Sequence, residues 1–250
     1  MPYGILRVRF SLFYFYSMPS HIVRNTQFAF DAVLFDCDGV LVDSEPITLR
    51  VMCEWLNHIG LKITYEQTIA RFLGKALHEE ISAIETDIGR PVPVNFIAGF
   101  RERRNAALAK DIVAIDGAGE LIDRLKSLGI AFAVASGADC AKMRITLGKT
   151  NMLSDFEHAL VGADMVAHTK PAPDVYLKAA QLLGVSAHRC LVIDDTPTGT
   201  QAGVAAGATV LGYCAFSDPS SLLDAGASGV FKSMYELPRL LGLNDFNSPQ

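Results

Sequence analysis

FDCDGVLVDSE, from Phe35 to Glu45, is the stretch that says most about how this chain folds. Two acids, Asp36 and Asp38, stand two residues apart where the short apolar run AVLF ends, so both side chains can point towards the same region. Gly39 follows, and a glycine lets the backbone turn closely around a bound substrate. In parallel α/β sheets, ligands bind just beyond the carboxyl ends of the strands. The segment therefore predicts a buried strand followed by a binding loop.

Similar apolar runs recur along the chain. The first covers Ala32–Asp36, and the others are Ile130–Ala135, His158–Val161, Cys190–Asp194 and Ala208–Gly212. Short runs that are apolar throughout are typical of strands buried on both faces of a parallel sheet. Helical patterns lie between them, as over Ala118–Ser127, Pro173–Leu183 and Gly199–Ala206. Strands that alternate with helices predict an α/β fold built on a doubly wound parallel sheet.

One long interval breaks this alternation. Roughly 90 residues separate the first predicted strand from the second, far more than a βαβ crossover needs. The interval shows helical patterning and no convincing strand, so we predict an all-helical cap domain at 46–112, inserted into a core domain of residues 30–45 and 113–250. Residues 1–29 are expected to form a poorly ordered extension. Met18 would serve as an alternative start, and the sequence does not settle whether residues 1–17 belong to the native protein.

Composition excludes several classes of protein. The 250 residues include 22 basic and 27 acidic side chains, and no block of five Lys or Arg occurs, which argues against a nucleic-acid binder and against a polybasic membrane patch. The 22 residues from Thr196 to Ser217 carry no charge but are too polar to insert into a membrane, so we expect a buried helix and then a strand there. The five cysteines form no CxxC pattern, which favours a reducing, cytoplasmic location.

Three further motifs fall where predicted strands end or a helix begins. Ser136 and Gly137 follow the second strand in VASG and offer a hydroxyl and backbone amides to a phosphate. Lys170 lies in TKPAPDVY, where two prolines stiffen the entry to a helix. Asp194 and Asp195 end a later strand in VIDDTPTG. The acid pair of the first motif, the hydroxyl, the lysine and this second acid pair therefore map to one rim of one sheet, where crowded carboxylates favour a hard cation such as Mg²⁺.

Taken together, these motifs resemble the haloacid dehalogenase superfamily of phosphotransferases over about Phe30–Gly212. The helical insertion resembles the cap of the branch that contains β-phosphoglucomutase and phosphoglycolate phosphatase. The stretches Lys142–Leu153 and Asp194–Gly207 resemble the bacterial sugar phosphatases typified by 6-phosphogluconate phosphatase. The resemblance implies a Rossmann-like core and a phosphoric monoester hydrolase. Its substrates would be small phosphorylated metabolites, either sugar phosphates or phosphosugar acids such as 6-phosphogluconate.

The resemblance also implies a role for each motif residue. Asp36 would be the nucleophile that forms an aspartyl-phosphate, and Asp38 would protonate the leaving alcohol and then deprotonate the attacking water. Ser136 and Lys170 would hold the phosphoryl oxygens, the lysine also orienting Asp36. An acid at position 38 further argues against enzymes that cleave carbon–halogen or carbon–phosphorus bonds. The residues implied for Mg²⁺ are Asp36, Asp38 through its backbone carbonyl, Asp194 and Asp195.

The cap is expected to choose the substrate. RFLGK resembles the family's specificity loop, so Arg71 or Lys75 would contact a sugar hydroxyl or a carboxylate, although both could equally be solvated cations at a helix end. Glu45 is expected to face the cap entrance, or else to cap a helix or mark a hinge. The cluster RERR, Arg101–Arg104, is interpreted as a solvated helix face.

Two other functions remain open at this point. A sugar phosphate mutase of the β-phosphoglucomutase kind would use the same residues but return the phosphoryl group to a sugar. An inactive binding protein on the same fold is the other alternative, against which the intact Asp36, Asp38, Lys170 and Asp195 count. Oligomeric state, monomer or dimer, cannot be decided from the sequence.

Overall fold

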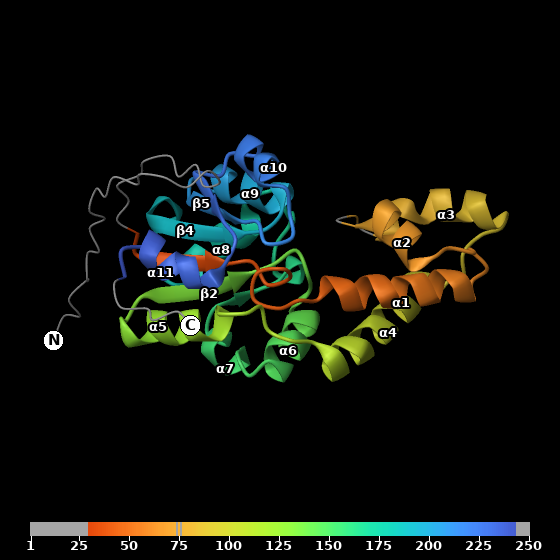
Figure 1. The fold of residues 1–250 in the computed structure, drawn as a ribbon, viewed down its shortest axis with the longest axis horizontal. Coiled ribbons are helices and arrows are strands. Elements are labelled where there is room, and N and C mark those ends of the chain that lie inside the picture. The colour runs from red at the N-terminus through yellow and green to blue at the C-terminus, as the bar shows by residue number, and fades with distance from the viewer. Residues whose placement is uncertain (1–29, 74, 76, 244–250) are drawn as a thin grey trace.

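A computed structural model describes residues 30–73, 75 and 77–243, and the strands within these ranges form one parallel sheet (Figure 1). The strand order is β3-β2-β1-β4-β5-β6. The expected extension at 1–29 lies outside the described residues. The strands are β1 (Ala32–Phe35), β2 (Ala131–Ala135), β3 (Leu160–Val161), β4 (Cys190–Asp194), β5 (Thr209–Tyr213) and β6 (Gly229–Phe231). The predicted α/β fold is therefore confirmed, and only the short strand β6 was not expected from the sequence.

Side chains of the central strand alternate between two apolar layers. Val33 and Phe35 of β1 pack into one layer, and Ala32 and Leu34 pack into the other, all four with no exposed surface. This period of two explains the apolar run, because a strand covered on both faces needs an apolar residue at every position. The strand lies between β2 and β4, so the carboxyl ends of these three strands are neighbours.

Helices cover both faces of the sheet. Residues of α5, α6, α7 and α11 pack into the layer that contains Phe35, and residues of α8 and α9 pack into the layer that contains Leu34. The helices are α5 (Ala118–Ser127), α6 (Cys140–Lys149), α7 (Leu153–Phe156), α8 (Asp174–Leu182), α9 (Pro197–Ala205), α10 (Pro219–Asp224) and α11 (Leu237–Leu240), with 3₁₀ turns at Ala163–Met165, Ala187–Arg189 and Met234–Glu236. No helix in the described ranges has the length and apolar character needed to cross a membrane.

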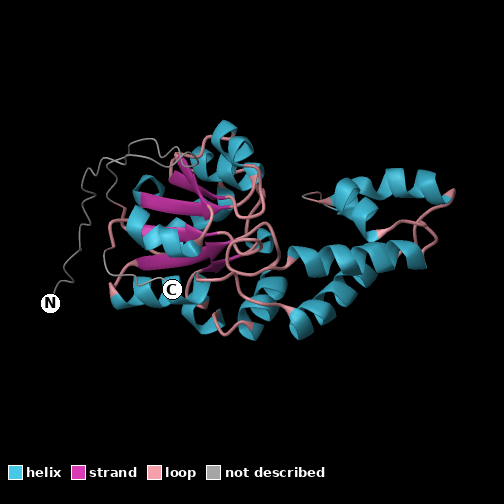
Figure 2. Ribbon diagram, viewed as in Figure 1, coloured by secondary structure: helices cyan, strands magenta, loops and turns pink. Residues whose placement is uncertain are grey.

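A second, all-helical part extends from one end of the sheet (Figure 2). It contains α1 (Glu45–His58), α2 (Tyr65–Phe72), α3 (Ile81–Ile88) and α4 (Phe96–Asp111), with a 3₁₀ turn at Leu77–Glu80. These helices have their own apolar cluster, in which Trp55 stacks on Phe96 with ring centroids 6.1 Å apart. An inserted helical cap is thus present, while the domain boundaries at 46 and 112 stay a prediction.

Two neighbouring chain segments join the cap to the core. The outgoing segment forms a tight loop in which the Gly39 amide donates to the carbonyl of Val42 at 2.8 Å. The returning segment pairs with it in an antiparallel bridge between Val42 and Ala114. Because Asp36 and Asp38 directly precede this connection, the acids of the first motif lie at the junction of sheet and cap.

Candidate active site

The predicted site residues of the core meet at the carboxyl edge of the sheet. Asp36 directly follows β1, and its amide donates to the carbonyl of Ile193 in β4 at 2.9 Å. Ser136 directly follows β2, and its amide donates to the carbonyl of Val161 at 3.0 Å. Asp194 is the last residue of β4. Regular strand pairing therefore brings these residues of β1, β2 and β4 to one rim, although 158 positions separate Asp36 from Asp194 in the chain.

Lys170 joins the two acidic motifs. Its Nζ donates to Oδ1 of Asp36 at 2.5 Å and to Oδ2 of Asp194 at 2.8 Å. The three side chains are 8%, 9% and 0% exposed, respectively. Although burial by itself lowers the pKa of Lys170, the carboxylates of Asp194 and Asp36 raise it well above its usual value. The lysine therefore stays charged and holds the Asp36 carboxylate in one orientation.

Asp36 itself has an unusual pKa for a carboxyl group. Burial raises its pKa from 3.8 to about 6, with Lys170 opposing the shift and the carboxylates of Asp194 and Asp38 adding to it. A bound cation would offset the repulsion from these neighbouring carboxylates and so lower the pKa of Asp36. An acid that is buried, oriented by a lysine and still ionised at neutral pH has the features of a nucleophile.

Asp38 has a lysine of its own. Lys142, from α6, donates to Oδ2 of Asp38 at 2.7 Å, and Ser44 donates to Oδ1 at 2.5 Å. Burial would raise the pKa of Asp38, but the charge of Lys142 and the hydrogen bonds from Lys142 and Ser44 lower it below its usual value. The two acids of the first motif therefore hold two different cations, and sequence reasoning identified only Lys170.

The two acids of the second motif, Asp194 and Asp195, differ in how many hydrogen bonds they accept. Asp194 accepts four hydrogen bonds: from Lys170 and Tyr176 on Oδ2, and from the amide and hydroxyl of Thr196 on Oδ1. A carboxylate offers about four acceptor positions, so Asp194 is saturated by protein donors. In contrast, Oδ1 of Asp195 is buried and has no hydrogen-bond partner among the described residues. Asp194, which the sequence placed among the metal ligands, holds Lys170, and Asp195 is the acid with an open oxygen; the metal role of both stays a prediction.

The open acid lies directly against the first motif. A Cβ added at Gly39 would come within 2.1 Å of Oδ2 of Asp195, and Gly39 also has a φ of +78°. Glycine is therefore required there for both space and backbone conformation. Burial raises the pKa of Asp195 well above its usual value, and the charges of Asp194 and Asp36 raise it further. An orphaned oxygen among repelling carboxylates fits a divalent cation.

The residues suited to such a cation are few. No group of three or more His, Cys, Asp or Glu side chains lies close enough to share one ion in the described part of the chain. The expected metal set of the Asp36, Asp194 and Asp195 side chains with the backbone carbonyl of Asp38 stays a prediction. The side chains of Asp36 and Asp195, together with the backbone carbonyl of Asp38, remain as oxygen donors of the kind that Mg²⁺ prefers.

The residues predicted to bind phosphate, Ser136 and Gly137, follow β2, which pairs with β1. Ser136 is 2% exposed, and its Oγ accepts from the amide of Ala138 at 3.1 Å, which leaves its hydrogen to donate. A Cβ at Gly137 would lie 3.5 Å from Oγ1 of Thr169, the residue before Lys170, so the loop after β2 approaches the lysine loop. A hydroxyl and an ammonium on adjacent loops can hold phosphoryl oxygens together.

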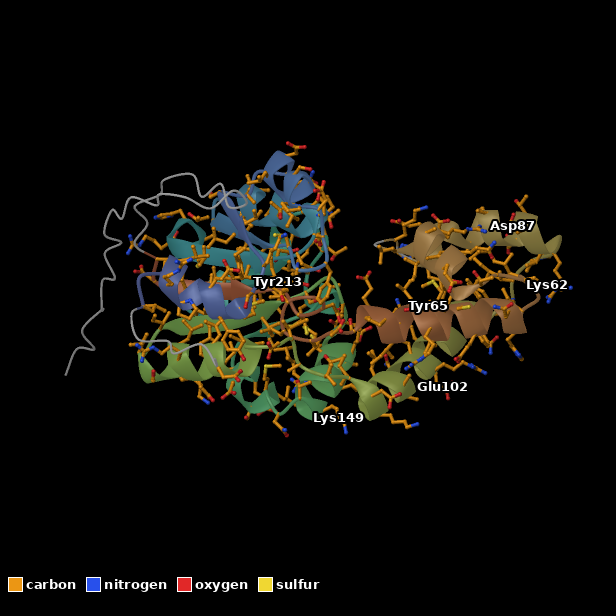
Figure 3. All side chains as sticks on the ribbon, viewed as in Figure 1. Lys62, Tyr65, Asp87, Glu102, Lys149 and Tyr213 are labelled. Carbon is orange, nitrogen blue, oxygen red and sulfur yellow. The ribbon has the colours of Figure 1, made fainter. Side chains whose placement is uncertain are left out.

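The two cap cations that the sequence predicted to contact substrate, Arg71 and Lys75, bind acids within the cap. Arg71 pairs with Asp87 at 2.5 Å, and Lys75 pairs with Glu80 at 3.2 Å, both within the cap. Asp87 lies in the cap on the side away from the sheet (Figure 3). Glu45 is the first residue of α1, and its expected place facing the cap entrance stays a prediction. The described residues thus give Arg71 and Lys75 acidic partners within the cap, and their expected contact with substrate stays a prediction.

Sequence reasoning missed several residues near the site. Lys142 lies in a stretch that was noted only for its overall likeness, and Tyr176 lies in the TKPAPDVY motif but was given no role. The interpretation of Arg101–Arg104 as a solvated face is wrong for its last residue. Arg104 is half-buried, burial lowers its pKa, and it is close enough to Asp139 and Asp38 to interact with their charges. Arg103 stacks on Trp55 at 4.2 Å.

Comparisons with known proteins agree with this geometry. A family model described as haloacid dehalogenase-like hydrolase matches residues 30–207. The chain is 30% identical to 6-phosphogluconate phosphatase of Escherichia coli, over 84% of this chain and 94% of that protein. A hydrolase structure from Deinococcus radiodurans with bound phosphate and sodium is 33% identical, with a TM-score of 0.73 over 86% of this chain and 96% of that one. A structure described as a putative β-phosphoglucomutase from Thermotoga maritima is 25% identical, with a TM-score of 0.73 over 86% and 100%.

Proposed function

The chain belongs to the haloacid dehalogenase-like hydrolases and is a phosphoric monoester hydrolase, and from this premise we propose that it is a Mg²⁺-dependent phosphatase of sugar phosphates or phosphosugar acids. One observation carries the proposal. Two acids, two residues apart at the carboxyl edge of a parallel sheet, each bind a separate lysine: the buried Asp36 binds Lys170, and the partly buried Asp38 binds Lys142. This arrangement separates a nucleophile from an acid/base group, as hydrolysis through a covalent intermediate requires.

In the proposed first step, Asp36 attacks phosphorus through the oxygen that Lys170 does not hold. The bond from phosphorus to the leaving oxygen breaks as an aspartyl-phosphate forms. Asp38, which takes up a proton when the phosphate monoester binds, passes that proton to the leaving alcohol. Ser136 and Lys170 donate hydrogen bonds to the phosphoryl oxygens. These bonds stabilise the negative charge that develops on those oxygens in the transition state. Mg²⁺, held by Asp36, Asp195 and the backbone carbonyl of Asp38, would offset the repulsion between carboxylate and phosphate.

In the proposed second step, Asp38 accepts a proton from a water molecule that attacks the same phosphorus. The bond from phosphorus to Asp36 breaks, inorganic phosphate leaves, and both acids return to their starting states. The sugar class of substrate is supported by the similarity to 6-phosphogluconate phosphatase. The cap helices would cover the bound substrate and exclude water from the first step.

The test is phosphate release from a panel of sugar phosphates, phosphosugar acids and phosphoglycolate, with Mg²⁺ or with EDTA. We expect metal-dependent release that Asp36→Asn reduces at least about a thousand-fold. Asp123→Asn is the matched control, because its side chain is 77% exposed on the outer surface. Isomerised sugar phosphate without free phosphate would replace the proposal with a mutase. Neither product from any substrate would favour an inactive binding protein.

A further inference from the structure

Lys142 is a buried lysine to which the two proposed reaction steps assign no role. It lies in the first turn of α6 and is 8% exposed, whereas Arg144 and Lys149 of the same helix are exposed. A lysine is rarely buried without a partner, because removing its charge from water is costly. The partner is Asp38, with Nζ 2.7 Å from Oδ2. The helix therefore directs one buried cation at one catalytic acid of the proposed reaction.

The second hydrogen bond to Asp38 comes from Ser44 and reaches its other carboxylate oxygen. Ser44 directly precedes α1, in the position where a serine normally caps a helix with its side chain. Its hydroxyl makes no such cap bond and instead donates to Oδ1 of Asp38 at 2.5 Å. One oxygen of Asp38 is thus bound by the core, and the other by the start of the cap. Two donors on different oxygens determine where the carboxylate lies and how it is rotated.

The number of donors distinguishes Asp38 from the structural acid of the site. Asp194 accepts four protein hydrogen bonds and has no acceptor position left. Asp38 accepts one on each oxygen, so each oxygen keeps one position for a leaving group or a water molecule. Asp38 is therefore held in place and remains able to exchange a proton.

We propose that Lys142 is a positioning residue that holds the carboxylate of Asp38 where it can reach the leaving oxygen of the substrate. This inference rests on the proposed function, in which Asp38 is the acid/base group. A general acid works only within hydrogen-bond reach of the atom it protonates, and a misplacement of about 1 Å can cost a hundred-fold in rate. Lys142 acts through Asp38 and makes no contact with the reacting phosphorus.

The test compares two leaving groups. An alkyl phosphate that the wild-type protein hydrolyses needs a proton on its departing oxygen, whereas p-nitrophenyl phosphate releases a stable phenolate. We expect Lys142→Met to lower kcat/KM for the alkyl phosphate by about ten- to hundred-fold and for p-nitrophenyl phosphate by less than about three-fold. Lys142→Arg keeps the charge and should restore most of the loss. The matched control is Lys149→Met, at the exposed end of α6, which should change neither value.

Other outcomes would overturn the proposal. An equal loss for both substrates would make Lys142 a structural or general binding residue, and no loss would remove any role in the reaction. A measurement without turnover tests the contact itself: NMR of ¹⁵N-lysine-labelled protein should show a slowly exchanging ammonium that Lys142→Arg removes and Asp38→Asn exposes to rapid exchange. Absence of that signal in the wild-type protein would contradict the pair. Absence of wild-type turnover would contradict the proposed function instead.

Discussion

The sheet edge and the cap both contain pairs of opposite charge, but they bury them to different degrees. At the sheet edge, the side chains of Lys170, Asp36 and Asp194 are 8%, 9% and 0% exposed. In the cap, the Lys75 and Glu80 side chains are 52% and 18% exposed. Buried charges lose hydration that their attraction repays only in part, whereas exposed pairs contribute about 0–1 kcal/mol. The edge is therefore built for chemistry at some expense of stability, and the cap must be stabilised by apolar packing.

Replacing Trp55 should give the largest change in stability, because this residue joins the apolar cluster of the cap. It stacks on both Phe96 and His58, and its Nε1 donates to the carbonyl of Phe96 at 3.1 Å. We expect Trp55→Ala to lower the free energy of unfolding of the cap by about 3–5 kcal/mol. Urea denaturation followed by circular dichroism measures this, since the chain has one Trp and the variant loses its fluorescence probe. A loss below about 1 kcal/mol would show that packing at Trp55 does not stabilise the cap.

Replacing Asp36 should raise the free energy of unfolding, whereas replacing Trp55 should lower it. Its pKa is raised from 3.8 to about 6, so between these values the folded protein binds a proton more tightly than the unfolded chain does. Stability therefore rises as the pH falls through this range. In EDTA, we expect Asp36→Asn to be more stable than the wild type by about 2–3 kcal/mol at pH 7, with the gap closing by pH 4. Denaturant titrations at each pH measure the gap; a gap independent of pH would show that ionisation of Asp36 is not its cause.

Tyr176 tests the support beneath the catalytic lysine. Its hydroxyl donates to Oδ2 of Asp194 at 2.6 Å, and both side chains are fully buried. Tyr176→Phe removes one of four donors to this carboxylate, and we expect a loss of about 1–2 kcal/mol in the free energy of unfolding. Thermal melts compare it with Tyr65→Phe, whose hydroxyl lies in the cap and makes an exposed 3.5 Å contact with the carbonyl of Pro46. An equal loss of stability in the two variants would show that the buried hydrogen bond of Tyr176 stabilises the protein no more than the exposed one of Tyr65.

The smallest effect is expected at Lys75. Because the Lys75 side chain of its pair with Glu80 is 52% exposed, Lys75→Met should change the free energy of unfolding by less than about 0.5 kcal/mol. The predicted substrate contact of Lys75 is tested on the same variant by KM for the best sugar phosphate. A rise of about five-fold or more would keep that prediction. An unchanged KM would leave Lys75 as a surface cation of the cap.

The elements that repeat a local pattern could be predicted from the sequence. The helix expected at Ala118–Ser127 has those same bounds, and four expected strands lie within about one residue of β1, β2, β4 and β5. Their apolar periodicity is a direct consequence of burial on one face or both. The three-residue strand β6, Gly229–Phe231, was not predicted, although the two-residue strand β3 lies within a predicted apolar run.

The α/β fold, the helical insertion and the acids of the two motifs could be predicted from the sequence, because each depends on residues close together in the chain. The partner that each acid holds depends instead on how distant segments pack. Lys142 and Asp38 are 104 residues apart, and no local pattern connects them. Likewise, Asp194 and Asp195 are neighbours in sequence, yet four donors saturate the first and none binds Oδ1 of the second. The reason is physical: side chains on adjacent strand-end residues point in different directions, and packing around each direction decides whether an acid supports the site or stays open to act in it.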